Sequence, residues 1–142
     1  MIPLSKSAIV IAAVSTTSAQ TATGIVDTKG FDFVNINVCS FTASTNALVT
    51  LSLKEGDTTS SFANVKVSGT DFTNAEGATA TLMTSAVVAA TFRVDMRGRK
   101  RYLQINATPT TTAILWSNAQ LYVADATPVA AATQGAANLI DV

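Results

Sequence analysis

The feature that most constrains the fold is a two-residue alternation of apolar and polar side chains. Val34, Ile36 and Val38 alternate with Asn35 and Asn37. Similar runs occupy residues 49–54, 62–67, 92–97, 102–107 and 114–123. Because successive side chains of a strand point to opposite faces of a sheet, this period predicts strands with one buried face rather than helices.

The last of these runs departs from strict alternation. Leu115 and Leu121 share one parity with Ser117, whereas Ile114 and Trp116 have the other. This pattern leaves two possibilities open: a strand that is apolar on both faces, or a strand that carries a bulge.

Turn-forming residues separate the runs at short intervals. The signals are Thr28-Lys29-Gly30, Ser44-Thr45-Asn46, Glu55-Gly56-Asp57, Asn74-Ala75-Glu76-Gly77, Arg97-Gly98-Arg99 and Thr108-Pro109. No helical period extends beyond a turn or two. Short strands at this spacing predict an all-β, antiparallel β-sandwich, and about eight strands would match the count of a jelly roll.

Large aromatic side chains are available to fill the layer between two packed sheets. We expect them to lie in the core, and an aromatic platform for a ligand is the alternative. They are Phe31, Phe33, Phe62, Phe72, Phe92 and Trp116.

The composition favours a single domain that assembles with other protein. A chain of 142 residues predicts one domain over residues 1–142. Nine basic residues balance nine acidic ones, which argues against nucleic-acid and membrane partners. Charged residues make up 13% of the chain, about half the usual share. Small neutral side chains protect a surface poorly against association, so we favour permanent assembly over a Thr-rich monomer.

Both ends of the chain are expected to form extended arms. Lys6 and the apolar run Ala8–Val14 imitate a short secretory signal, but the run is too short to cross a bilayer. We interpret residues 1–19 as part of the mature chain, forming an N-terminal arm or a first strand. Residues 126–142 contain an Ala-rich stretch and are interpreted as a C-terminal tail.

The residues that carry most enzyme chemistry are missing or scattered. The chain has no histidine, and its single cysteine, Cys39, lies in an apolar run. Zinc sites and histidine-activated nucleophiles need residues that are absent, and a lone cysteine forms no internal disulfide. We therefore predict no catalytic residue, no metal, no cofactor and no enzyme activity. A sugar hydrolase, whose two carboxylates can lie far apart in sequence, is the alternative.

One cluster of charge is a candidate partner contact. Arg97, Arg99, Lys100 and Arg101 stand together between two alternating runs, and Gly98 supplies the backbone freedom for a hairpin tip. Three interpretations stay open. The cluster could bind phosphate, form a solvated turn that protects a sheet edge, or bind an acidic patch on a partner.

Two segments carry a resemblance to a known family. They are Asp27-Thr28-Lys29-Gly30-Phe31-Asp32-Phe33-Val34 and the run from Leu51 to Ser60, which ends in a turn with Phe62 shortly after. The layout resembles the jelly-roll cement proteins that decorate tailed-phage heads, over residues 20–125. The resemblance implies β-sandwich subunits, which in many such proteins stand as trimers or dimers at symmetry axes and bridge neighbouring capsomers. It implies no particular contact residues.

We therefore expect a virion structural protein on the outer capsid surface, with the major capsid protein and copies of itself, as a trimer, for partners. One alternative is a glycan- or receptor-binding β-sandwich of a virion, with Tyr102, Asn106, Trp116 and Asn118 as candidate contacts. Another is a different assembled coat or tail subunit.

Overall fold

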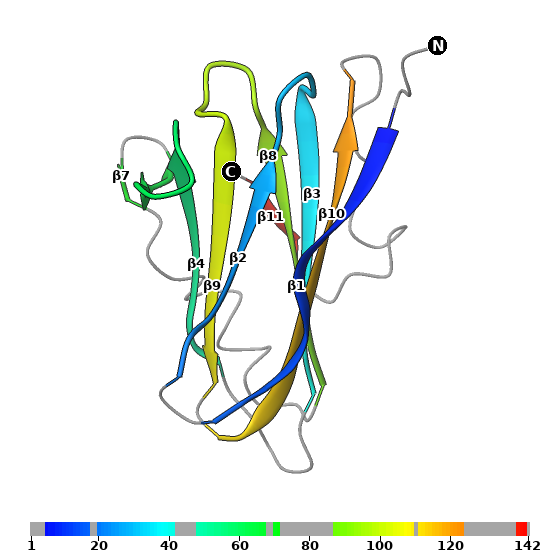
Figure 1. The fold of residues 1–142 in the computed structure, drawn as a ribbon, viewed down its shortest axis with the longest axis vertical. Helices are drawn as coiled ribbons and strands as arrows, with labels where there is room; N and C mark the ends of the chain where they lie inside the picture. Colours follow the sequence, from blue (N-terminus) through cyan, green and yellow to red (C-terminus); the bar gives the residue numbers. More distant parts are fainter. Residues whose placement is uncertain are drawn as a thin grey trace.

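The computed structural model describes residues 5–17, 20–41, 48–67, 70–71, 87–109, 111–123 and 139–141. Within these residues the chain is all-β, and its strands form two facing sheets (Figure 1). The strands are β1 (Ser5–Thr16), β2 (Ala22–Asp27), β3 (Phe33–Phe41), β4 (Leu48–Gly56), β5 (Ala63–Asn64), β6 (Lys66–Val67), β7 (Thr70–Asp71), β8 (Val87–Asp95), β9 (Tyr102–Pro109), β10 (Ala113–Tyr122) and β11 (Leu139–Asp141).

The strand order is that of a jelly roll, which resembles a long hairpin rolled up across two sheets. Sheet A has the order β1-β10-β3-β8-β11, and sheet B has the order β2-β9-β4-β5. Apart from β11, strands near the start of the chain pair with strands near its end, and the pairing continues inward along the sequence. β1 pairs with β10, β2 with β9, β3 with β8 and β4 with β5, and all four pairs are antiparallel. The predicted antiparallel jelly-roll sandwich of about eight strands is therefore confirmed in the described part of the chain. β6 and β7 form a separate small pair.

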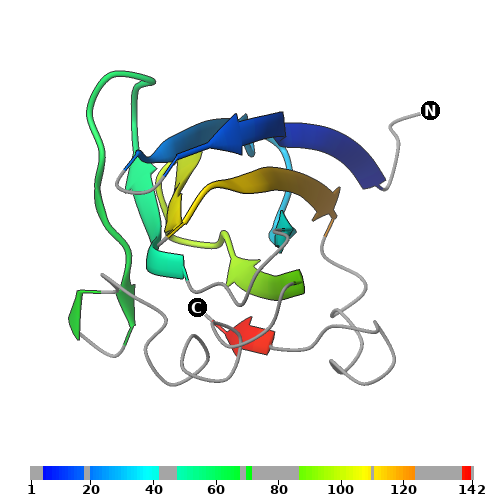
Figure 2. The ribbon, with the colours of Figure 1, turned by 90° about the horizontal axis from the view of Figure 1, so that it is seen from below.

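The N-terminal segment forms a strand at the edge of sheet A. β1 pairs with β10, and its register shifts between Ile9 and Ile11 and again between Ile11 and Val14. The bulge considered for the last alternating run thus occurs in β1, whereas β10 pairs with β3 in unbroken register. β1 lies beside β2 where the two layers meet (Figure 2). The approach is close, because a Cβ at Gly24 would overlap the carbonyl oxygen of Val10.

Of the predicted C-terminal tail, the structure describes β11. It adds to the outer edge of β8 in parallel, with Leu139 opposite Thr91 and Asp141 opposite Arg93. The predicted turns at residues 44–46 and 74–77, and Phe72, lie outside the described residues.

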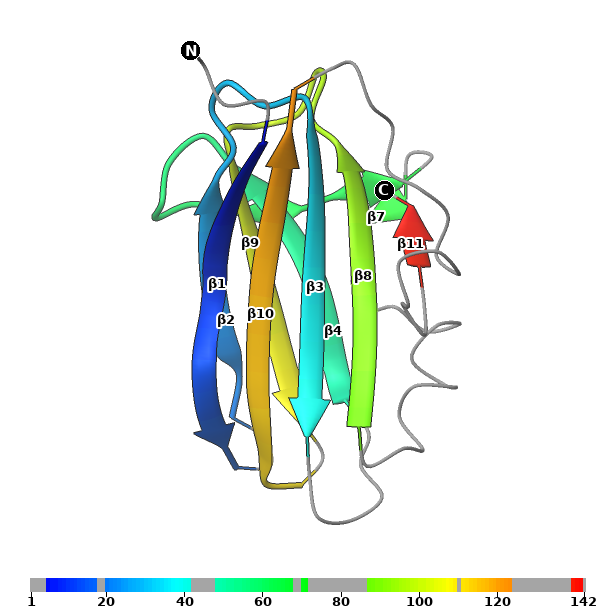
Figure 3. The same cartoon turned by 90° about the vertical axis from the view of Figure 1, so that its right-hand side faces the viewer.

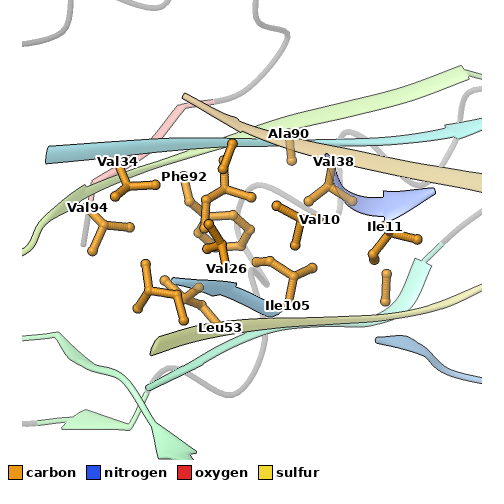
Figure 4. Packing of buried hydrophobic residues seen from close by; sticks show 14 of the residues in the cluster. Val10, Ile11, Val26, Val34, Val38, Leu53, Ala90, Phe92, Val94 and Ile105 are labelled. Carbon is orange, nitrogen blue, oxygen red and sulfur yellow. The ribbon is translucent and has the colours of Figure 1, made fainter. Parts of the chain in front are cut away.

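The core lies between the sheets and follows the alternation that the sequence predicts (Figure 4). β3 contributes Val34, Ile36 and Val38, all almost completely buried. Sheet B contributes further apolar side chains from β4 and β9, Leu51, Leu53, Leu103 and Ile105 among them. Apolar burial of this kind supplies most of the stabilisation of a sandwich.

The aromatic side chains divide between the core and the surface. Phe92 is fully buried, and Phe31 packs against the core. The prediction that Phe33 and Trp116 are core residues is wrong, because each alternates with buried neighbours and lies on the outer side of sheet A.

No helix among the described residues is long and apolar enough to cross a membrane.

Candidate functional site

The basic cluster lies in the turn that connects β8 of sheet A to β9 of sheet B, at the upper end of the sandwich in Figure 1. Gly98 has a φ of 84°, the left-handed conformation that glycine adopts without strain. The amide of Arg99 donates to the carbonyl of Met96 at 3.0 Å and closes the turn. A turn is therefore present where the sequence predicts one. The prediction of a hairpin tip is wrong, because β8 belongs to sheet A and β9 to sheet B, so the turn connects the two sheets.

Each of the four cations meets a carboxylate of the same chain. Arg97 pairs with Asp95 at 2.6 Å and Arg101 with Asp27 at 2.6 Å. Lys100 lies 3.2 Å from Asp57. Arg99 lies 3.6 Å from Glu55. We call these eight residues the charged tip.

The pair of Asp27 and Arg101 has the geometry of a fork. Nε and Nη2 of Arg101 donate to the two oxygens of Asp27 at 2.9 and 2.6 Å. Asp27 also accepts from the amide of Lys29 at 3.1 Å. The hydrogen bond from Arg101 is the largest cause that lowers the pKa of Asp27 to about 2, since it stabilises the charged carboxylate.

The carboxylate of Asp95 is bound by the guanidinium of Arg97 in a similar fork. Its carboxylate accepts from Nε and Nη2 of Arg97 and from the Arg97 amide. The side-chain hydrogen bond from Arg97 is the main cause that lowers the pKa of Asp95 to about 2. The Arg97 guanidinium also lies over the ring of Phe33, 5.0 Å from its centroid. This contact accounts for the position of Phe33 on the outer surface.

The pair of Glu55 and Arg99 differs from the others by its burial. The side chains of Arg99 and Glu55 are 18% and 19% exposed, whereas that of Asp57 is 73% exposed. Oε2 of Glu55 is buried and too far from Arg99 for a hydrogen bond. Water screens this pair less than the others, so its loss would leave an unpaired charge in a poorly solvated place.

The segments that carry the family resemblance meet at the charged tip. The hydroxyl and the amide of Thr28 both donate to the carbonyl of Arg101. The amide of Asp32 donates to Tyr122, and its carbonyl accepts from Met96 at 2.7 Å. Gly30 has a φ of 85° and ends the predicted turn. The described residues of these segments thus have structural roles in joining the turns of both sheets.

The charged tip offers no obvious reactive group. Its four cations balance four carboxylates, and the described residues hold no cluster of three Asp, Glu or Cys side chains that could bind a metal. Intramolecular pairing reduces the positive field available to phosphate. The assignment of Arg97, Arg99, Lys100 and Arg101 to a partner contact stays a prediction.

A second surface, which the sequence reasoning missed, lies on the outer side of sheet A (Figure 3). Ile114 of β10 is directly opposite Phe41 of β3, and these side chains are 50% and 42% exposed. The next outward pair is Trp116 and Cys39, both half-buried. On the neighbouring strand, Ile9 is 69% exposed. These apolar side chains come from three adjacent strands, β1, β10 and β3.

Polar side chains beside this group are bonded to one another. The Asn37 amide nitrogen donates to Oδ1 of Asn118 at 3.1 Å, and the hydroxyl of Thr91 donates to Oδ1 of Asn37 at 2.7 Å. Ile9 lies opposite Asn118 in the same row. We call the apolar group and this ladder together the neutral face; its members are Ile9, Asn37, Cys39, Phe41, Thr91, Ile114, Trp116 and Asn118.

The neutral face lies mainly on β1, β3 and β10, which carry no charged residue beyond Lys6; its fourth strand, β8, carries Arg93 and Asp95 beyond Thr91. No Lys, Arg, Asp or Glu occurs in residues 7–26, 33–53 or 102–123. Burial raises the pKa of the Cys39 thiol, so this side chain is also neutral near pH 7. A count of charge along the chain would have located this surface from the sequence.

The four candidate glycan contacts do not form one site. Tyr102 and Asn106 lie on the outer side of sheet B, whereas Trp116 and Asn118 lie on the outer side of sheet A. Asn106 bonds to Thr23 and Gln104 on its own sheet. Trp116 and Asn118 adjoin the exposed side chains of Ile9 and Ile114, whereas Tyr102 and Asn106 flank the position opposite Ile25.

Comparisons with known proteins identify no family. No protein-family model and no curated protein sequence matches the chain. One similar solved structure is that of a family GH115 4-O-methyl-α-glucuronidase with specificity for decorated arabinogalactans, with 11% identity and a TM-score of 0.40. The match covers 84% of this chain and 16% of that enzyme, so the chain spans only a small part of its length. A likeness this weak carries no argument about function.

Proposed function

We propose that this chain is a virion structural protein that decorates the outer surface of a tailed-phage capsid. In this role a homo-oligomer, with a trimer as the expected form, bridges neighbouring subunits of the major capsid protein. The protein needs no catalytic residue or cofactor for it.

The observation that carries the proposal is the contrast between the charged tip and the neutral face. The tip balances its charges within the chain, while the outer side of sheet A exposes Ile9, Phe41 and Ile114 without a charge beside them. An exposed apolar group on a rigid sandwich is typical of a surface that another protein covers. The resemblance of the Asp27–Val34 and Leu51–Ser60 segments to cement proteins adds the class of assembly.

The physical logic of such a protein is mass action. A protein that binds only the expanded capsid lattice stabilises that lattice against reversal and rupture. Several weak contacts made by one oligomer add to a strong attachment.

The direct test uses tailed-phage heads assembled from a purified major capsid protein. We expect the purified protein to sediment with expanded heads, at a fixed ratio, and to raise the temperature at which they break. Unexpanded heads serve as the matched control and are expected to bind little. Failure to bind expanded heads would exclude the proposal.

A glycan-binding virion module is the second candidate, favoured by the position of Trp116 beside Asn118 on an exposed face. An assembled coat or tail subunit is the third. A glycan array separates the second from the first, and the growth of shells or tubes from this chain alone would indicate the third.

A further inference from the structure

We propose that the neutral face is the surface through which one copy of this chain binds another. This inference rests on the proposed function and refines its oligomer: a face that packs against the same face of a second copy forms a two-fold pair, so the contact it names is that of a dimer and not of the expected trimer. It is argued from charge, hydrogen bonding and size.

The charge pattern restricts the partner. β10 and β3 carry no charged residue, and neither does β1 beyond Lys6. A partner that placed a charge against these strands would have to bury it without a counter-ion, which is costly. The members of the neutral face are all uncharged, so the same residues of a second copy satisfy this restriction where they touch.

Asn37, the central polar residue of the face, tolerates burial. Both amide atoms of Asn37 are already bonded, to Asn118 and to Thr91. A buried polar group is costly mainly when it lacks a hydrogen-bond partner, so covering the bonded Asn37 side chain costs little binding free energy. Ile9, Phe41 and Ile114 provide apolar area whose removal from water favours association.

The uncharged part of the face supplies a large share of the area that a stable contact needs. It lies on β1, β10 and β3, which are adjacent in sheet A, and β3 has nine residues. With strands about 4.8 Å apart and a rise of about 3.4 Å per residue, these three strands present roughly 440 Å² before side-chain relief is added. A stable interface buries about 800 Å² of accessible surface on each partner. The three strands therefore supply about half of the contribution of one subunit before relief is counted.

The experiment compares Ile114→Lys and Phe41→Lys with Ile25→Lys. Ile25 is the matched control, because it is 37% exposed on the outer side of sheet B. Sedimentation velocity over a micromolar concentration series gives the oligomeric state, and circular dichroism verifies the fold. We expect the wild type and Ile25→Lys to associate alike, and each neutral-face variant to dissociate at least about tenfold more readily.

Trp116 supplies a test that requires no substitution. It is the single tryptophan of the chain and belongs to the neutral face. We expect its emission to move to longer wavelength as the wild-type oligomer dissociates on dilution. A monomeric wild type at all concentrations, an unchanged emission across dissociation, or neutral-face variants that associate like Ile25→Lys would each overturn the inference.

The outcomes separate this inference from the proposed function. If Ile25→Lys associates but binds no expanded heads, the contact is supported and the capsid role is not. If the wild type binds heads as a monomer, the capsid role stands and the contact is wrong. A third outcome is a wild type that is always monomeric and binds a glycan, with both neutral-face variants losing that binding. This result would show that the face binds a sugar and not a second copy.

Discussion

The charged tip and the neutral face belong to the same sandwich but are held by different forces. At the tip, three ion pairs join the β8–β9 turn to β2 and to the end of β4, and the pair of Arg97 and Asp95 lies within that turn. Three of the four pairs have well-exposed side chains. On the neutral face and in the core behind it, apolar packing and a short ladder of neutral hydrogen bonds stabilise the structure. The difference indicates which surface is available to bind another protein. The tip pairs its charges within the chain, whereas the neutral face leaves apolar side chains exposed to water.

The largest expected effect tests the close packing of the uncharged strands. In Gly24→Ala the new methyl group would overlap backbone atoms of Val10, so β1 and β2 must separate. We expect a loss of about 3 kcal/mol in the free energy of unfolding, or no folded protein. Gly98→Ala is the control: its Cβ meets nothing within 4 Å, and its positive φ alone should cost about 1 kcal/mol. Equal losses in urea titrations of the two variants would contradict the packing account.

The next effect concerns the half-buried ion pair of the tip. Arg99→Met keeps the aliphatic stem but leaves Glu55 without its cation, so we expect a loss of about 1–2 kcal/mol. Lys100→Met, whose partner Asp57 is exposed, should cost about 0–1 kcal/mol. Denaturation at low salt and at about 1 M salt, where the Debye length is about 3 Å, checks the cause. If Lys100→Met costs as much as Arg99→Met, burial does not set the strength of these pairs.

A smaller effect of opposite sign is expected inside sheet A. The hydroxyl of Ser117 is buried with no hydrogen-bond partner among the described residues. Ser117→Ala should therefore leave stability unchanged or raise it by up to about 1 kcal/mol. Thr91→Val removes a hydroxyl that is bonded to Asn37, and should lower stability by about 1 kcal/mol. Thermal unfolding of the two variants shifting in the same direction would argue against this reasoning.

The smallest effect is the response to acid, and it belongs to the tip. Asp27 and Asp95 have pKa values lowered to about 2, so their ion pairs contribute fully above the ordinary carboxylate pKa of about 3.9. The contribution is lost as the pH falls from about 4 through about 2. Since the chain has no histidine, stability should be flat between about pH 5 and pH 8.

The variant Asp27→Asn sharpens this test. It removes one of the two groups, so its melting temperature should fall less than that of the wild type between about pH 4 and pH 2. Parallel curves for the two proteins would show that Asp27 does not contribute.

The sequence allowed much of the fold to be predicted, because alternation reports directly on which side chains are buried. Val34, Ile36 and Val38 were assigned to the core in this way, and Gly30 and Gly98 to turns. The same parity places Phe33, which precedes Val34, on the outer side. Its size suggested the core, whereas Arg97 covers its ring on the surface.

The contacts of the candidate sites depended on strand order and were not predictable from local patterns. Arg101 and Asp27 are 74 positions apart and meet because β2 pairs with β9. Glu55 reaches Arg99 because β4 lies on the other side of β9. The neutral face likewise required the pairing that sets Ile114 opposite Phe41.

The most direct measurement is a reconstruction by electron cryo-microscopy of expanded heads incubated with this protein. The account predicts paired or grouped jelly rolls on the outer surface, with the strands of sheet A, from Ile9 to Ile114, packed against a neighbouring copy. Bare heads, or isolated subunits whose β3 and β10 face only solvent, would contradict it.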